Sequence, residues 1–191
     1  MVAISGGDKF EARLRKIAER LASGKSLRVG FLEGTTYDDG TSVPMVATVN
    51  EFGGKINVPA HETTIYRKTN KDGSFAKGGK FVRRKASNFA SDHQVPAHTI
   101  TIPARPFMRP TVAAHEQEWA DAIAPLLKNA NYDAAKALGQ LGLVIHGNIV
   151  DSIQAVTSPP LAPSTVRRKG FDKPLIDTSV MWKSIREQVD T

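Results

Sequence analysis

The sequence predicts an α+β fold, in which a small mixed sheet is packed by several helices and a long basic hairpin or loop extends from the core. Three observations lead to this prediction. Long amphipathic runs with helical spacing are interspersed with short runs of β-like alternation. The two kinds of run follow no regular βαβ order, which argues against a doubly wound sheet. The length of 191 residues suits one domain, so we expect a single α+β domain over residues 1–191, with residues 67–90 as a protruding basic arm.

The N-terminal part predicts a helix followed by a strand. Between residues 8 and 22, apolar side chains recur at steps of four, three and four, which places them on one helical face: Phe10, Leu14, Ile17 and Leu21. Asp8 is suited to cap this helix and Gly24 to end it. Residues 27–32 then alternate apolar side chains with other residues, which is typical of a strand.

A second helix is predicted over residues 44–52, after a polar loop at residues 33–41. Pro44 fits the first helical turn, and Gly53 offers a left-handed cap at the end. Glu51 lies in the last turn of this helix. No paired carboxylate or histidine is near it in sequence, so we expect a surface side chain and not a catalytic acid or base.

The most unusual composition lies between residues 56 and 102. Strand character is found at residues 56–66 and again at 99–102, and the segment between them is predicted to leave the core as an extended hairpin or loop. Asp72 is the only acid in a stretch that holds eight basic residues: Arg67, Lys68, Lys71, Lys77, Lys80, Arg83, Arg84 and Lys85. Aromatic side chains are interleaved with them at Phe75, Phe81 and Phe89.

This composition leaves two interpretations open. Basic residues with interleaved aromatic rings can contact phosphates and stack on bases, whereas a solvated arm can dock on a neighbouring subunit. The candidates for a subunit or partner interface are Arg67, Lys68, Phe75, Phe81, Arg83, Arg84 and Lys85. The candidates for contact with DNA are Lys77, Lys80, Arg83 and Arg84.

The segment from Ile102 to Thr111 contains three prolines, which restrict the backbone and disfavour helical geometry in the residues before them. It is therefore predicted to be a stiff extended strap, with a helix beginning at Thr111. Phe107 is the expected anchor of this strap in the core, flanked by the planar charged groups of Arg105 and Arg109. The alternative is a plain proline-rich connection between a strand and a helix.

Two long helices are predicted after the strap. The first covers residues 112–127, and Pro125 should kink or end it near Ala124. The second covers residues 133–156, with Asp133 as its cap, and is the expected central helix of the core. It contains three glycines that lower its helix propensity but allow a neighbouring element to approach closely: Gly139, Gly142 and Gly147.

The C-terminal part begins at residues 157–160, where two prolines end the preceding helix. A helical turn is predicted over residues 163–169, ended by Gly170, and its last three residues form a second basic cluster, Arg167–Lys169. A last helix is expected from Asp177 or Thr178 through Ile185, followed by a short strand at residues 188–189.

Composition and spacing indicate no catalytic, cofactor or metal site. The chain has no cysteine, which excludes disulfides, thiolate metal sites and a cysteine nucleophile. His93 and His98 are five residues apart in an extended segment, which is not a zinc-binding pattern. Residues 1–8 lack the pattern of a secretory signal and no apolar run approaches membrane-spanning length, so we expect a soluble protein made in the cytoplasm, without a membrane partner. The formal charge of +7 favours acidic partners such as nucleic acid.

Four stretches, in this order, resemble a family of tailed-bacteriophage proteins. They are Arg28–Leu32, Val46–Gly53, Ile102–Pro110, and the C-terminal stretch Leu161–Gly170 with Pro174–Thr178. The family comprises the neck or tail-completion proteins of virion morphogenesis, related to the minor tail protein Z type. The resemblance begins near residue 25 and excludes the basic segment 67–90. The chain departs from the family pattern at Ser179, where a glycine is usual, and at Ala162, where a serine cap is common.

The resemblance implies a structural, non-enzymatic virion protein that forms a ring of identical subunits at the head–tail junction. Its partners would be other neck and tail proteins, namely a head-closure or connector protein and a tail terminator or tail tube. Genomic DNA in the channel is a further partner to expect. The protein would reside in the host cytoplasm before assembly and then in the neck or tail of the virion. The alternative is a nucleic-acid-binding protein that uses the basic arm and the Arg167–Lys169 cluster.

Overall fold

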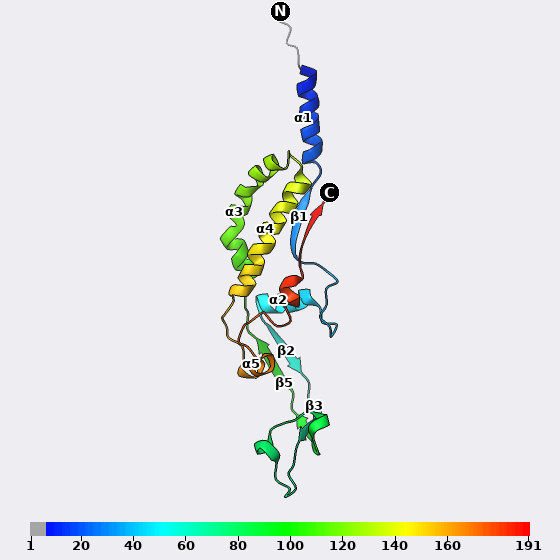
Figure 1. Cartoon of the computed structure of the whole chain (residues 1–191), viewed down its shortest axis with the longest axis vertical. Helices are drawn as coiled ribbons and strands as arrows, with labels where there is room; N and C mark the ends of the chain where they lie inside the picture. Colours follow the sequence, from blue (N-terminus) through cyan, green and yellow to red (C-terminus); the bar gives the residue numbers. More distant parts are fainter. Residues whose placement is uncertain (1–6) are drawn as a thin grey trace, which may run out of the picture. The chain divides into compact units, whose positions relative to one another are not determined.

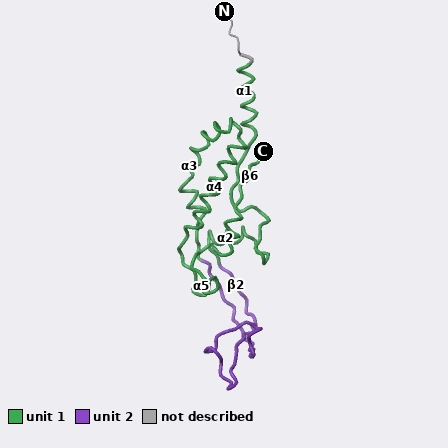
Figure 2. Tube along the Cα trace, in the orientation of Figure 1, with its two compact units in different colours: residues 1–54, 103–191 green, residues 55–102 purple. Residues whose placement is uncertain are grey.

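The computed structural model describes residues 7–191 and divides into two compact units. The first unit comprises the described residues up to Gly54 together with Pro103–Thr191, and the second comprises Lys55–Ile102 (Figure 2). Helices and small sheets together make an α+β fold, which confirms the predicted class. The strands form three separate two-stranded sheets, however, and not one mixed sheet.

The first unit contains six α-helices and one sheet (Figure 1). The helices are α1 (Gly7–Leu21), α2 (Val43–Phe52), α3 (Met108–Asn129), α4 (Ala134–Ala155), α5 (Pro163–Lys169) and α6 (Val180–Lys183). The two strands, β1 (Ser26–Phe31) and β6 (Ile185–Asp190), pair antiparallel over their whole length. The cap predicted at Asp8 lies outside the side chains that the structure describes.

The last helix is shorter than predicted and the last strand is longer. Ser179 has a left-handed backbone, with φ 65°, and α6 begins only after it. Ile185 was expected at the end of this helix, but it is fully buried in β6 and pairs with Phe31 of β1. The prediction failed because this pairing joins residues more than 150 positions apart, which a local pattern does not reveal.

The core of the first unit lies where α4, α2 and the strap meet the β1–β6 sheet. Its fully buried apolar residues come from five segments: Val43, Ala47, Phe107, Ile149, Ile153, Met181 and Ile185. Helix α4 contacts both strands of the sheet and also packs against α3. The amphipathic run at residues 133–156 was therefore correctly assigned to the central helix, and Asp133 caps it by accepting a hydrogen bond of 3.0 Å from the Lys136 N–H.

One of the three glycines of α4 serves the predicted close approach. A Cβ atom on Gly142 would lie 3.0 Å from Glu187 Cβ and 3.1 Å from Leu27 Cδ1, so the sheet packs directly on this helix position. Gly139 and Gly147 have no such neighbour within 4 Å. Gly24 was expected only to end α1, but it also allows close packing, because its Cβ would lie 2.8 Å from the backbone N of Ala135.

Helix α3 differs from its prediction at both ends. It begins at Met108, so Arg109 and Pro110 belong to its first turn, where a proline is tolerated because its missing N–H needs no partner. The strap is thus shorter than predicted. Pro125 does not end the helix, which continues to Asn129. The last turn is held by backbone bonds, since the Ala130 and Tyr132 N–H groups donate to the carbonyls of Leu126 and Leu127 at 2.9 and 2.7 Å.

The second unit is built from two strand pairs and irregular connections. Strand β2 (Gly54–Val58) pairs with β5 (His98–Ile102), and β3 (His61–Arg67) pairs antiparallel with β4 (Phe89–Val95). The β3–β4 ladder runs from His61↔Val95 to Arg67↔Phe89. Two short 3-10 turns, η1 (Ala76–Gly79) and η2 (Arg84–Ala86), lie in the connection between β3 and β4.

No residue between Lys55 and Ile102 is fully buried. The second unit therefore has no hydrophobic core of its own, and its order rests on backbone ladders and local side-chain contacts. None of the helices within residues 7–191 is both long enough and apolar enough to cross a membrane.

Candidate functional site

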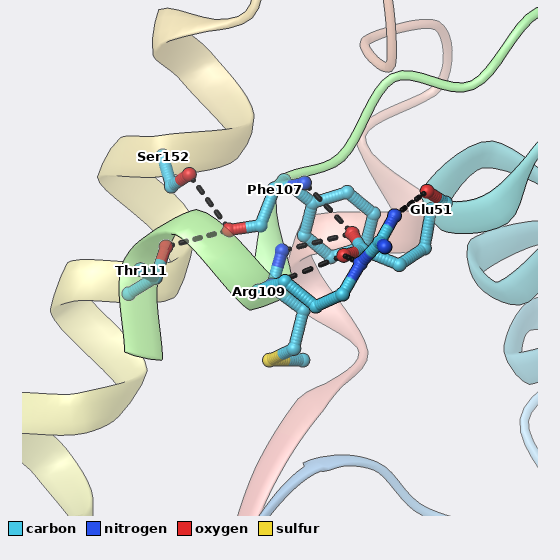
Figure 3. A network of polar contacts seen from close by, with 6 residues as sticks. Glu51, Phe107, Arg109, Thr111 and Ser152 are labelled. Atoms are coloured by element: carbon cyan, nitrogen blue, oxygen red, sulfur yellow. Dashed lines mark hydrogen bonds and ion pairs between the residues drawn. The ribbon is translucent and has the colours of Figure 1, made fainter. Parts of the chain in front are cut away.

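The start of α3 is held by a buried carboxylate from α2 (Figure 3). Glu51 is only 5% exposed, and its Oε2 accepts hydrogen bonds from the backbone N–H groups of Phe107 and Met108 at 2.7 and 2.9 Å. Its Oε1 accepts from the backbone N–H of Arg109 at 3.0 Å and from the Arg109 Nε at 2.9 Å. The Arg109 Nη2 also donates to the Glu51 backbone carbonyl at 2.9 Å. One side chain thus satisfies three N–H groups at the helix start, where α3 has no capping side chain of its own.

Two opposing effects act on the pKa of Glu51. Burial by itself raises the pKa because it disfavours the charged form. The hydrogen bonds from three backbone N–H groups and from Arg109 favour the carboxylate and outweigh burial, so the pKa of Glu51 lies below its usual range. Glu51 is therefore a charged structural group at neutral pH and is poorly suited to donate or accept a proton in catalysis.

The prediction that Glu51 is a surface residue was wrong. Glu51 lies at the C-terminal end of α2, where a negative charge is unfavourable for the helix dipole. That placement was a usable signal, because an acid in this position needs compensation from outside its own helix. The compensating groups lie 56 to 58 residues away, which is why nearby sequence did not show them.

The three predicted anchor residues bind at different places: Arg109, in the first turn of α3, binds this carboxylate, whereas Phe107 enters the core and Arg105 binds the backbone at residues 159–160. Phe107 is 1% exposed and packs edge-on against Phe31, with ring centroids 5.9 Å apart. The Phe107 carbonyl accepts from the hydroxyls of Thr111 and Ser152 at 2.6 and 2.9 Å. Arg105 is 7% exposed, and its guanidinium donates to the carbonyls of Pro159 and Pro160 at 2.7 and 3.0 Å.

In the second unit, the connection between β3 and β4 gathers three of the predicted interface residues into one cluster. The Arg67 guanidinium lies 5.2 Å from the ring centroids of both Phe75 and Phe81, within range of cation–π attraction. Phe75 also packs edge-on against Phe89 at 5.5 Å. All three rings remain exposed, and Phe81 is the most exposed of them at 67%. We call Arg67, Phe75, Phe81 and Phe89 the aromatic cluster.

The remaining predicted residues of the basic arm surround the aromatic cluster without joining it. Lys77 has a left-handed backbone in η1, with φ 53°, and Lys80 follows this turn. Arg84 and Lys85 are the first two residues of η2, which Arg83 precedes. The side chains of Lys68, Lys77, Lys80, Arg83, Arg84 and Lys85 are all exposed. Among the described residues, no lysine or arginine between positions 67 and 85 takes part in an ion pair.

The charge of the arm accounts for the charge of the whole chain. The eight basic residues between Arg67 and Lys85 face one acid, which is an excess equal to the formal charge of +7 of the protein. The rest of the chain is therefore balanced. Such a concentrated positive charge, free of internal pairing, is suited to bind a polyanion or an acidic protein surface.

No protein-family model, curated protein or solved structure matches the chain.

The described side chains contain no group that resembles a metal site. Within residues 7–191, no three His, Asp or Glu side chains lie close enough together to hold a metal ion. His93 binds the Ser91 hydroxyl at 2.8 Å, whereas the His98 Nδ1 lies 3.0 Å from the Pro96 carbonyl. These two histidines thus have separate local partners.

Proposed function

We propose that the protein is a structural virion component of a tailed bacteriophage, which forms a homo-oligomeric ring at the head–tail junction and is needed for head–tail joining. The observation that carries the proposal is the second unit, which has ordered strand pairs but no fully buried residue. Two-stranded sheets without a hydrophobic face to pack on are marginally stable in water. A unit of this kind is best explained by a partner surface that covers it in an assembly.

The exposed apolar side chains support the same proposal. Phe75, Phe81 and Phe89 are 43%, 67% and 40% exposed, and Ile56 and Ile100 of the paired strands β2 and β5 are about half exposed. The three phenylalanine rings gather around Arg67, and exposed apolar patches mark interaction sites on soluble proteins. Arginine and aromatic residues are also the types enriched at the energetic centres of interfaces. The aromatic cluster is therefore the part of the arm that we assign to a neighbouring subunit or another neck or tail protein.

A ring requires each subunit to offer two different surfaces. An arm can provide one of these surfaces while the rest of the fold stays unchanged, because an extended segment can pair with the edge strand of a sheet in another subunit. We assign the assembly to the head–tail junction because four stretches of the sequence resemble neck and tail-completion proteins. In that position the unpaired lysines and arginines of the arm would face genomic DNA in the channel or an acidic partner.

The Arg83, Arg84 and Lys85 cluster allows a direct test. All three would be replaced by serine in a copy that complements a phage lacking the gene. We expect reduced ring assembly, or particles that lose DNA after packaging. A control with the same loss of charge replaces Lys128, Lys136 and Lys183, three exposed lysines of the first unit, by serine. Normal ring assembly together with normal DNA retention in the arm variant would remove both roles from this cluster.

The second candidate is a nucleic-acid-binding protein, which the concentrated charge of the arm favours. The Arg167–Lys169 cluster contributes less than the sequence suggested. The Lys169 Nζ is partly buried and donates to the carbonyls of Lys173 and Ile176, and burial is the main cause that lowers its pKa. Arg167 and Arg168 remain exposed.

Salt dependence of DNA binding tests this second candidate. Each phosphate contact contributes about 0.9 to the slope of log affinity against log salt concentration. Replacement of Lys77 and Lys80 by glutamine should reduce that slope by about 2 if both lysines bind phosphates. The matched control replaces Lys128 and Lys136 by glutamine and should leave the slope unchanged. Equal slopes for the two variants would exclude these arm lysines from DNA contact.

A further inference from the structure

Helix α1 carries two parallel rows of side chains with the same spacing. The basic row is Lys9, Arg13, Lys16 and Arg20, and each of these residues directly precedes a member of the apolar row, Phe10, Leu14, Ile17 and Leu21. Both rows advance by four, three and four residues, so they follow the helix side by side. Such a helix is built to lie in an apolar groove with an acidic border.

The apolar row is largely uncovered within the part of the chain that the structure describes. Phe10, Leu14 and Leu21 are 65%, 49% and 42% exposed. Most of α1 has no other element of its unit beside it in Figure 1. Its described contacts with the rest of the unit lie in its C-terminal half. Arg20 Nη1 donates to the Asn131 carbonyl at 3.2 Å, and a hollow beside Asn131 and Tyr132 is bordered by Arg13, Lys16 and Ile17. Single exposed leucines are ordinary, but a continuous row on one helix face calls for a partner.

A matching surface lies on the seam between α3 and α4. A hollow at this seam is lined by Ala114 and His115 of α3 and by Asn148 and Asp151 of α4. Helical steps of four, three and four lead from Ala114 to Glu118, Asp121 and Pro125 along the same face of α3. On α4, a step of four leads back from Asp151 to Gly147, and further steps of three and four lead from Gly147 to Val144 and Leu143.

This seam face is apolar, acidic and open. Leu143 and Val144 are 61% and 44% exposed, and the three acids Glu118, Asp121 and Asp151 of the same two helices are exposed as well. Glu118 pairs with His115 at 2.8 Å, and Asp121 accepts from Gln117 at 3.0 Å, both within α3. Between residues 111 and 127 of α3, and between 137 and 155 of α4, the sequence contains no lysine or arginine. The face from Ala114 to Pro125 spans eleven residue steps, as does the row from Phe10 to Leu21, so the two surfaces are equally long at about 16 Å.

We infer that α1 of one subunit docks in the α3–α4 seam of a second copy of this chain, where it becomes a third packed helix. The inference rests on the proposed function in one respect, namely that identical subunits contact one another. The basic row meets Glu118, Asp121 and Asp151, and the apolar row covers Leu143 and Val144. Because the helix and its seam are different surfaces, the contact is heterologous and can propagate around a ring. It gives the subunit a second contact that is independent of the basic arm.

A pair of charge-reversed variants tests the contact. The first variant carries Lys9→Glu and Arg13→Glu on α1, and the second carries Glu118→Lys and Asp121→Lys on the seam. Each variant alone brings like charges together, so self-association measured by sedimentation velocity should weaken by at least about tenfold. A mixture of the two should recover near wild-type association, because each helix then meets a seam of opposite charge. Circular dichroism of each variant establishes that it is folded.

Each matched control makes the same change in net charge as its variant, but at other exposed positions. Arg167→Glu with Arg168→Glu is the control for the first variant, and Glu33→Lys with Asp38→Lys is the control for the second; all four residues are exposed. Both controls should associate as the wild type does. An uncharged variant, Leu14→Gln, should also weaken association, whereas Met45→Gln, at a 55% exposed methionine of α2, should not.

Three results would overturn the inference. The first is wild-type association in both reversed variants, and the second is a mixture that associates no better than its components. The third is a wild-type protein that stays monomeric at all concentrations while α1 binds anionic phosphatidylserine vesicles, which would make a lipid surface the occupant of the basic and apolar rows. These results leave the proposed function to be judged separately, by the phenotype of a phage that lacks the protein.

Discussion

Replacement of Glu51 by glutamine should destabilise the first unit by about 3 kcal/mol. Glutamine has nearly the same shape, so packing is retained, but one carboxylate oxygen becomes an NH2 group that cannot accept hydrogen bonds. If the amide oxygen stays with Phe107 and Met108, the backbone N–H and the Nε of Arg109 lose their acceptor. Hydrogen bonds to a charged group contribute roughly 1.5–3 kcal/mol each. Water recovers part of the loss at Arg109, because this side chain is 59% exposed.

Urea unfolding followed by circular dichroism at 222 nm measures this free energy. The matched control is Glu116→Gln, an exposed glutamate of α3, which should change the free energy of unfolding by less than about 0.5 kcal/mol. A loss of about 3 kcal/mol is a large part of the 5–15 kcal/mol that stabilises a typical domain. A difference below about 1 kcal/mol between Glu51→Gln and the wild type would refute the view that this carboxylate holds the start of α3.

Three further predictions concern the same unit. Because the pKa of Glu51 is lowered on folding, the stability contributed by this carboxylate is present above the unfolded pKa of roughly 4.3 and is lost as pH falls through the folded pKa. The difference in free energy of unfolding between wild type and Glu51→Gln should therefore shrink below about pH 4. A difference that stays constant with pH would contradict the assignment. Phe107→Ala should cost about 3–5 kcal/mol in urea unfolding, since it empties a 1% exposed site in the core, and a cost near 1 kcal/mol would show that the core closes over the gap. Gly142→Ala should cost about 1–3 kcal/mol, because the added Cβ meets the sheet at 3.0 Å, whereas Gly147→Ala, with no neighbour within 4 Å, should be neutral or stabilising.

The helices of the first unit could be predicted because their periodicity is local. Apolar side chains recur at helical steps through residues 133–156, as a central helix requires, and α4 follows this run closely. The same kind of pattern at residues 8–22 also predicted α1 correctly. Periodicity alone could not tell that the apolar row of α1 is largely exposed, because a helix face looks the same whether its own chain or another molecule covers it.

The features that the sequence did not reveal depend on contacts between distant residues. The role of Glu51 required Phe107 and Arg109 to be brought to the end of α2. Strand β6 was predicted only over residues 188–189, and its full length from Ile185 to Asp190 follows from pairing with β1. In the second unit, the composition indicated a basic arm, but the stacking of Phe75 and Phe81 around Arg67 follows from the path of the β3–β4 connection. Local patterns thus gave the elements, and long-range pairing gave the site.

The central claim is the proposed role in head–tail joining. Its most direct test is a nonsense codon in this gene, placed in the genome of the phage that the proposal assigns it to. Lysates would be imaged by negative-stain electron microscopy, with a plasmid copy of the wild-type gene as the control for polarity. We predict separate DNA-filled heads and unjoined tails, which the plasmid copy restores to whole particles; the length of the free tails would show whether tail completion itself failed. Intact, joined virions without this protein would contradict the proposal and would favour the nucleic-acid-binding function instead.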